Sequence, residues 1–172
     1  MNGPSLFRCP LCGSPLTREE RGCICPARHS FDRAAAGYVH LLPPNRMHSK
    51  APGDDREMVA ARAAFLERGY YAPLRQALEE LVLEASAHLE GPVLLDSGCG
   101  EGYYTAGMFR ALERAGHRPR AAGIDISKYA LRRAAKRLPE GEFAVASAYR
   151  LPLADASADL LTNVFSPLSR SE

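Results

Sequence analysis

LLDSGCGEGYYT, residues 94 to 105, is the stretch that decides the fold. An apolar run ends at Asp96, and three glycines follow with a single residue between each, at Gly98, Gly100 and Gly102. A helical pattern comes next. Glycines at such a turn let a ligand approach backbone N–H groups without meeting a Cβ, and the helix N-terminus favours negative charge there. A strand, a glycine loop and a helix in this order predict a nucleotide-like ligand at the end of a parallel strand.

The chain around this loop alternates short apolar runs with helical segments. Helices are predicted near residues 104–115 and 128–138, the second capped by Ser127. This alternation predicts an α/β fold with a Rossmann-like parallel sheet of about four strands and right-handed crossovers. The four predicted strands are Pro92–Leu95, Arg120–Ile124, Glu142–Ala146 and Asp159–Val164.

Two further helices are predicted ahead of the sheet. The first follows a cap at Asp54 or Asp55 and stops at Gly69, and the second begins at about Pro73. Their predicted apolar faces are Met58, Ala61, Phe65 and Leu66 in the first helix and Leu74, Leu78, Leu81 and Val82 in the second. Residues 36–53 are rich in proline, glycine, histidine and basic residues, which predicts an irregular connector.

A second acid strengthens the interpretation of the glycine loop. Asp125 ends the next strand, and neighbouring parallel strands open their carboxyl ends onto one crevice. The pattern D-x-G-x-G-x-G is typical of S-adenosylmethionine-dependent methyltransferases, and its third glycine comes one residue too early for the dinucleotide pattern. Asp125 is then expected to accept the ribose hydroxyls, with Ala146 and Ser147 beside the adenine. The alternative is a glycine turn needed only for close packing and an acid that caps a helix. Cys99 is expected to be a small filler.

Four cysteines and a histidine crowd the start of the chain. Cys9, Cys12, Cys25 and His29 give the spacing C-x2-C-x12-C-x3-H. Two close pairs on two turns are what a tetrahedral Zn²⁺ site requires, and four protein ligands would make the zinc structural. Cys23 is left out, because a C-x-C pair is cramped for two ligands of one tetrahedron. Buried thiols without a metal and a redox C-x2-C pair are the alternatives.

Composition sets the broad class. Of 172 residues 46% are hydrophobic and 24% charged, no apolar run approaches the roughly 20 residues of a membrane span, and no secretory signal is evident. A cytoplasmic location and no membrane partner are expected, and in a reducing cytosol clustered cysteines favour a metal over disulfides. The net charge of +2 is uneven, since residues 1–50 carry seven basic and three acidic side chains. That stretch is either a mixed solvated surface or a site for an anionic partner.

With both motifs in hand, the chain resembles the bacterial 23S rRNA (guanine-N1)-methyltransferases of the RlmA type, which include macrolide-resistance relatives. The resemblance runs from Phe7 to about Pro167. It rests on FRCPLCGSPL, CICPARHSFDRAAAGYVHLLP, PGDDREMVAARAAFLERGYYAPL, LLDSGCGEGYYT, GIDISKYALRRAAKR and VASAYRLPLAD. It implies a zinc-binding module at residues 1–35, a connector at 36–53 and the N-terminal part of a methyltransferase domain at 54–172.

The resemblance also implies roles for individual residues. The zinc ligands become Cys9, Cys12, Cys25 and His29, in a module thought to help recognise rRNA. Cofactor contacts are implied for Tyr71 and for the pair Gly100 and Glu101. With Asp96 and Gly98 of the loop motif and Asp125 at the end of the next strand, these make the predicted set for S-adenosylmethionine. No catalytic residue is assigned, although Asn163 could hold the edge of the guanine and Phe165 could stack on it, or both could be ordinary strand-end residues.

The expected activity is methyl transfer from S-adenosylmethionine to N1 of a guanine in 23S rRNA. The family's sheet has three more strands, in the order 3-2-1-4-5-7-6, so this chain is expected to be truncated at its C-terminus and to expose its fourth strand as an apolar edge. The alternative is a catalytically inactive, zinc-bearing module that binds RNA or the cofactor. A homodimer, or a second chain that supplies the missing half, is a further expectation.

Overall fold

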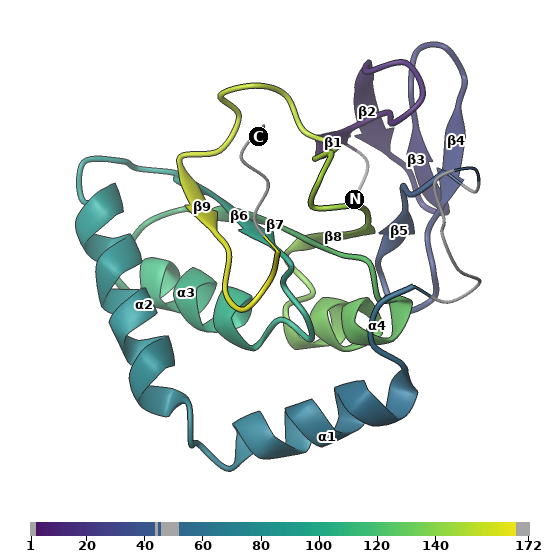
Figure 1. Ribbon diagram of the computed structural model, residues 1–172. Helices are drawn as coiled ribbons and strands as arrows, with labels where there is room; N and C mark the ends of the chain where they lie inside the picture. The colour runs from purple at the N-terminus through teal and green to yellow at the C-terminus, as the bar shows by residue number, and fades with distance from the viewer. Residues whose placement is uncertain (1–2, 44, 46–51, 168–172) are drawn as a thin grey trace.

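Two sheets and four helices make up the computed structural model, which describes residues 3–43, 45 and 52–167 (Figure 1). The first sheet is antiparallel and has the order β1-β2-β3-β4. The second has the order β5-β8-β7-β6-β9, and all its neighbouring strands are parallel. The strands are β1 (Gly3–Arg8), β2 (Pro15–Arg18), β3 (Gly22–Ile24), β4 (Ser30–Asp32), β5 (Val39–His40), β6 (Val93–Ser97), β7 (Arg120–Asp125), β8 (Glu142–Val145) and β9 (Leu160–Thr162). The helices are α1 (Arg56–Glu67), α2 (Ala72–Ser86), α3 (Tyr103–Arg114) and α4 (Lys128–Arg137).

The α/β prediction is confirmed, and all four predicted strands form, as β6, β7, β8 and β9. A fifth strand was missed. β5 lies inside the predicted irregular connector, where Val39 and His40 pair with Ala144 and Val145 of β8. Two residues are too few to show an alternating pattern, and their backbone is held in the sheet by the edge of β8. The prediction of an irregular segment is therefore wrong at Val39–His40, and the rest of the division into modules stays a prediction.

Local sequence sets where α1 and α4 begin. The Asp55 side chain accepts hydrogen bonds from the backbone N–H groups of Glu57 and Met58, both at 2.9 Å, so it caps α1. The Ser127 hydroxyl caps α4 by accepting from the N–H of Ala130 at 3.3 Å. Both caps were predicted.

The predicted apolar faces of the first two helices are partly wrong. α1 buries Val59, Ala63 and Leu66, whereas Met58 is 53% and Phe65 44% exposed. In α2 Val82 is buried but Leu81 is 58% exposed. An alanine-rich helix such as α1 offers several faces of similar polarity, so its sequence pattern does not decide which one meets the core.

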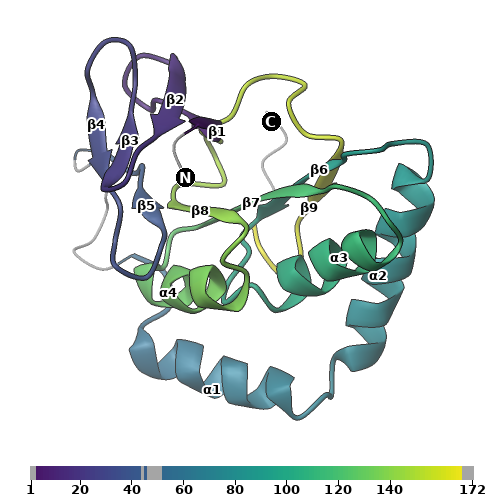
Figure 2. The same ribbon diagram turned by 180° about the vertical axis from the view of Figure 1, so that it is seen from behind.

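Successive side chains of a parallel strand point to opposite faces of the sheet and pack in two different hydrophobic cores. Leu94 of β6 belongs to a cluster with Leu112 of α3 and Leu131 of α4, whereas its neighbour Leu95 belongs to a cluster with Phe7 and Leu16 of the antiparallel sheet. The helices lie together on one side of the parallel sheet, and the antiparallel sheet lies on the other (Figures 1 and 2). The cysteine-bearing module therefore shares a core with the parallel sheet.

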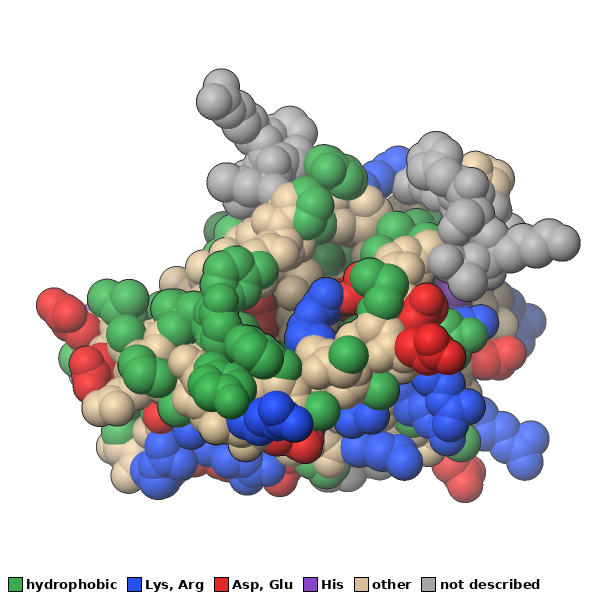
Figure 3. All heavy atoms as spheres, turned by 60° about the horizontal axis from the view of Figure 1, so that its bottom comes forward, with side chains coloured by type: hydrophobic (Ala, Val, Ile, Leu, Met, Phe, Trp, Pro, Cys, Tyr) green, Lys and Arg blue, Asp and Glu red, His purple; other side chains and the backbone are tan. Residues whose placement is uncertain are grey.

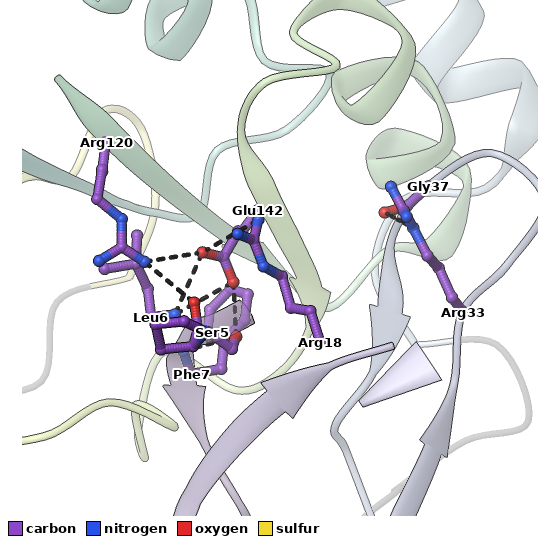
Figure 4. Close-up of polar contacts among 9 residues, drawn as sticks. Ser5, Leu6, Phe7, Arg18, Arg33, Gly37, Arg120 and Glu142 are labelled. Carbon is purple, nitrogen blue, oxygen red and sulfur yellow. Dashed lines mark hydrogen bonds and ion pairs between the residues drawn. The ribbon is translucent and has the colours of Figure 1, made fainter. Parts of the chain in front are cut away.

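A buried carboxylate reinforces this junction. Glu142, at the start of β8, accepts hydrogen bonds from the Ser5 hydroxyl at 2.5 Å and from the Leu6 N–H at 3.1 Å. Arg120 of β7 and Arg18 of β2 lie 3.3 and 3.7 Å from the same carboxylate (Figure 4). Groups from both sheets therefore converge on one side chain that is only 9% exposed.

β9 lies at one edge of the parallel sheet in the part of the chain that the structure describes. Leu160 is buried but Leu161 is 57% exposed, so the apolar edge predicted for this strand is present there. Among the described residues no helix has the length and apolar character that crossing a membrane would take.

Candidate functional site

A cavity of about 530 Å³ opens at the carboxyl ends of the parallel strands. This edge is where open α/β sheets bind ligands, because successive strands leave loops there that diverge. Its walls come from the glycine loop and the start of α3, the ends of β7 and β8, the segment after β9, and α1 with the turn that follows it. The lining residues include Asp54, Arg62, Phe65, Tyr71, Gly98, Gly100, Glu101, Tyr104, Asp125, Ala146, Ser147, Tyr149, Phe165 and Ser166.

The glycine loop lies at the floor of this cavity. Gly98, with φ +83°, adopts a left-handed backbone that other residues rarely take. A Cβ on Gly98 would also overlap the Ser166 side chain, so the segment after β9 packs directly on the loop. Gly98 N–H and Cys99 N–H both donate to the Ile124 carbonyl at 2.9 Å, which ties the loop to β7. Cys99 itself is buried, as expected of a small filler.

Asp125 joins the ends of two strands. One carboxylate oxygen accepts from the Gly100 N–H at 3.0 Å and the other from the Ser127 N–H at 2.7 Å. Burial raises the pKa of this carboxyl, and the two backbone hydrogen bonds oppose the rise. Each oxygen keeps a free lone pair, so the carboxylate can still accept hydroxyl donors from a ligand in the cavity. The geometry is compatible with the predicted ribose contact.

Glu101 carries an unsatisfied acceptor. Its side chain is buried, at 2% exposure, and its Oε1 has no hydrogen-bond partner among the described residues. Burial raises the pKa of Glu101, and nearby Arg137, Arg62 and Arg133 lower it. A buried carboxylate oxygen without a donor is costly, and this residue lines the cavity, so a ligand with an N–H or O–H group would satisfy it.

Asp96 is the one member of the predicted cofactor set that does not line the cavity. It is 2% exposed, behind the loop, and its Oδ2 accepts the Thr105 hydroxyl at 2.5 Å. Burial raises the pKa of Asp96 to about 6, against the lowering effect of that hydrogen bond. Through this hydrogen bond Asp96 holds the first turn of α3 against the end of β6. The other five residues of the predicted set line the cavity: Tyr71, Gly98, Gly100, Glu101 and Asp125.

The segment after β9 closes another wall of the cavity. Phe165 lines it with its ring 5.7 Å from Tyr71 and 6.5 Å from Tyr104, centroid to centroid. Asn163 does not line it, and its amide donates to the Pro167 carbonyl at 3.1 Å. The two residues suggested for guanine recognition therefore differ, since only Phe165 faces the cavity.

Several lining residues were missed by sequence reasoning. Phe65 of α1 was predicted to face the core and Arg62 of α1 was not singled out, and Tyr149 and Ser166 come from loops. Arg62 forms an ion pair with Asp54 at the cavity wall. These positions depend on how α1 and the loops fold back over the sheet, and no local motif marks them.

The structure brings the four predicted metal ligands together. The ligand atoms of Cys9, Cys12, Cys25 and His29 all lie within 4.8 Å of one another. Cys12 and Cys25 sulfurs are 3.7 Å apart, and the His29 Nδ1 is 3.5 Å from the Cys9 sulfur and 3.4 Å from the Cys25 sulfur. Bond lengths of zinc to thiolate and imidazole predict about 3.8 Å and about 3.6 Å for these edges of a tetrahedron. The four side chains therefore fit Zn²⁺.

Ser14 and Cys23 lie close to the four ligands in the sequence, and the Ser14 side chain hydrogen-bonds to one of them. Hydrogen bonding to the Ser14 hydroxyl and backbone lowers the pKa of the Cys12 thiol to about 6, which favours the thiolate. Cys23 is buried and lies outside the cluster, as predicted, and burial raises the pKa of its thiol. A four-ligand, closed site is structural.

Comparison with known proteins agrees with both sites. A sequence profile for the N-terminal zinc ribbon of RlmA matches residues 7–50, and one for a methyltransferase domain matches residues 95–166. The 23S rRNA (guanine(748)-N(1))-methyltransferase of Streptomyces fradiae is 39% identical over 167 residues, which cover 96% of this chain and 57% of that protein. A protein of Micromonospora griseorubida, named for the same class of activity, is 39% identical over 185 residues, 96% of this chain and 60% of that protein.

The chain belongs to the RlmA-type methyltransferase family. This RlmA-type chain spans about 60% of the length of the curated relatives that it matches. Its fold is also that of a solved S-adenosyl-L-methionine-dependent methyltransferase from Methanococcus maripaludis, with a TM-score of 0.54 and 17% identity over 70% of this chain and 54% of that one. The RlmA-type chain thus combines a class I methyltransferase sheet with a zinc ribbon, as the sequence predicts.

Proposed function

We propose that this chain binds S-adenosylmethionine in the 530 Å³ cavity and transfers its methyl group to N1 of a guanine in 23S rRNA. The observation that carries the proposal is the convergence of five of the six predicted cofactor residues on that cavity. Asp125 offers acceptors at the end of β7, and the unsatisfied Glu101 oxygen offers another beside the glycine loop. Family membership supports the choice of substrate.

The bound cofactor supplies an electrophilic methyl group, so the protein's task is to align donor and acceptor and to exclude water. Gly98 and Gly100 remove side chains from the approach to the loop. Asp125 and Glu101 provide oxygens to orient hydroxyl and amino groups, and Tyr71 and Phe165 form an apolar wall. Guanine N1 must lose a proton during the transfer, and we assign no catalytic base.

The zinc ribbon is proposed to serve recognition of the rRNA. Its ligands hold the turns of residues 9–12 and 25–29, and its core is continuous with the sheet that carries the cavity. A ribbon fixed in this way would present its RNA contacts at a constant position relative to the methyl donor. We further propose that a second chain, either another copy of this one or a different protein, pairs with the exposed edge at β9 and completes the acceptor side of the cavity.

One observation favours a second candidate, a module that binds the cofactor without catalysis. Ser166 packs on Gly98, and Leu161 is exposed on β9, so among the described residues the short segment after β9 forms the acceptor side of the cavity. In that case S-adenosylmethionine would bind but no methyl group would move.

The test is transfer of radiolabelled methyl from S-adenosylmethionine to unmodified 23S rRNA by the purified chain. Methylation at N1 blocks the pairing edge of guanine, so reverse transcription should stop at the modified nucleotide. Asp125→Asn should lose activity through a weaker cofactor affinity, and Glu90→Gln, at an exposed and distant ion pair, should behave as wild type. Cofactor binding without any incorporation would favour the non-catalytic module.

A further inference from the structure

An exposed aromatic surface continues outward from the cavity. Five rings form a contiguous series, Tyr70, Phe65, Tyr71, Phe165 and Tyr104, with successive centroids between 5.1 and 6.5 Å apart. Large aromatic side chains are normally at least half buried. Here Phe165 is 78% and Tyr70 63% exposed, Phe65 beside them is 44% exposed, and hydrophobic side chains gather on the side of the molecule shown in Figure 3. Such a patch marks an interaction site.

Tyr70 and Phe65 form the outer part of this series. Phe65 lines the cavity, but Tyr70 does not. The two rings are 5.1 Å apart with an angle of 34° between their planes, and Tyr70 sits in the turn between α1 and α2. The Tyr70 ring therefore lies outside the space that the cofactor would fill, and a role in cofactor binding would leave its exposure unexplained.

The exposed face of α1 continues the same surface. Met58, Ala61, Arg62 and Phe65 recur at helical spacing on a different side of α1 from the buried Val59 and Ala63. Arg68 follows at the end of the helix, is exposed, and forms no ion pair with any residue that the structure describes. Aromatic rings interleaved with an unpaired arginine are the side chains with which proteins bind unpaired nucleotides, by stacking on bases and attracting phosphates.

We infer that Phe65 and Tyr70 form a platform on which an unpaired nucleobase of the RNA, a neighbour of the methylated guanine, stacks. The inference rests on the proposed function and adds a second recognition point to it. The continuity of the rings with the cavity wall is the reason for choosing a neighbouring nucleotide, because a base next to the target must lie just outside the cavity. Arg68 is then placed to meet the backbone phosphate of the same segment.

The experiment compares Tyr70→Leu with Tyr70→Phe in the full chain. Leucine keeps an apolar side chain but removes the ring face, whereas phenylalanine keeps it. Affinity for an unmodified 23S rRNA transcript is measured by fluorescence anisotropy, and affinity for S-adenosylmethionine by titration calorimetry. Tyr70→Leu should weaken RNA binding about 5- to 150-fold, the range for loss of one base-aromatic stack. Tyr70→Phe should stay within about 2-fold of wild type, and cofactor affinity should be unchanged in both.

Leu81→Ser is the matched control, since Leu81 is similarly exposed, at 58%, but lies on α2 and does not line the cavity. It should leave RNA affinity unchanged. Wild-type RNA affinity in Tyr70→Leu would overturn the platform, as would an equal loss in the Leu81 variant or a change of oligomeric state that accounts for the loss. A wild-type chain that binds no rRNA would overturn the proposed function itself, which separates the two failures.

Discussion

Substituting Glu142 tests whether the zinc ribbon and the parallel sheet form one cooperative unit. Glu142→Gln keeps the shape of the side chain and one oxygen acceptor but removes the charge. The carboxylate accepts two hydrogen bonds, from Ser5 and Leu6, and faces two arginines at 3.3 and 3.7 Å. The arginine side chains are 47% and 34% exposed, so solvent screens both ion pairs.

The expected loss follows from these contacts. A hydrogen bond to a charged group contributes about 1.5–3 kcal/mol, and glutamine forfeits roughly one of the two. Each screened ion pair adds at most about 1 kcal/mol. We therefore expect Glu142→Gln to lower the free energy of unfolding by about 2–4 kcal/mol.

Urea unfolding, followed both by circular dichroism and by zinc release to a dye, gives the measurement. Both signals should shift together to lower urea. Glu90→Gln is the control. Glu90 pairs with Arg118 at 3.2 Å, and the side chains are 80% and 83% exposed, so this substitution should lower the free energy of unfolding by less than about 0.5 kcal/mol. A loss below about 0.5 kcal/mol in Glu142→Gln, or a shift in the zinc signal alone, would refute a shared unit.

Two further predictions concern buried groups. Because burial raises the pKa of Asp96 from 3.8 to about 6, the fold favours its protonated form, so its contribution to stability is nearly full at about pH 3 and is lost as the pH rises through about 6 to about 7. Between about pH 3 and about pH 7 wild type should therefore lose about 3 kcal/mol of unfolding free energy relative to Asp96→Asn, and a difference independent of pH would contradict the prediction. Cys12→Ser should abolish zinc binding, measured by metal analysis, whereas Cys23→Ser should keep it, because Cys23 lies outside the cluster; zinc retained in Cys12→Ser would contradict the four-ligand site.

Most of the architecture could be predicted because its signals are local. The strand, glycine loop and acid of residues 94–105 mark the sheet and its ligand edge, and ligand spacing alone brings Cys9, Cys12, Cys25 and His29 together. These features depend on backbone geometry and on short-range chemistry. The same is true of the caps at Asp55 and Ser127.

The features that were missed depend on tertiary packing. β5 exists because β8 offers a free edge to Val39 and His40, and Phe65 stays 44% exposed because α1 buries the face that carries Val59 and Ala63 instead. Asp96 is the acid of the loop motif, but it lies behind the loop, whereas Asp125 at the end of the next strand faces the cavity. Motif position predicts which residues surround a ligand site better than it predicts which of them touch the ligand.

Binding of S-adenosylmethionine to the full chain, measured by titration calorimetry with Asp125→Asn beside it, tests the central claim most directly. The account predicts saturable binding to wild type that weakens about 10-fold or more in Asp125→Asn, because two ribose hydroxyls lose a charged acceptor. Asp125→Asn must remain folded and zinc-loaded for the comparison to hold. No binding by a folded, zinc-loaded wild-type chain, or equal affinity in both proteins, would contradict the assignment of the cavity to the cofactor.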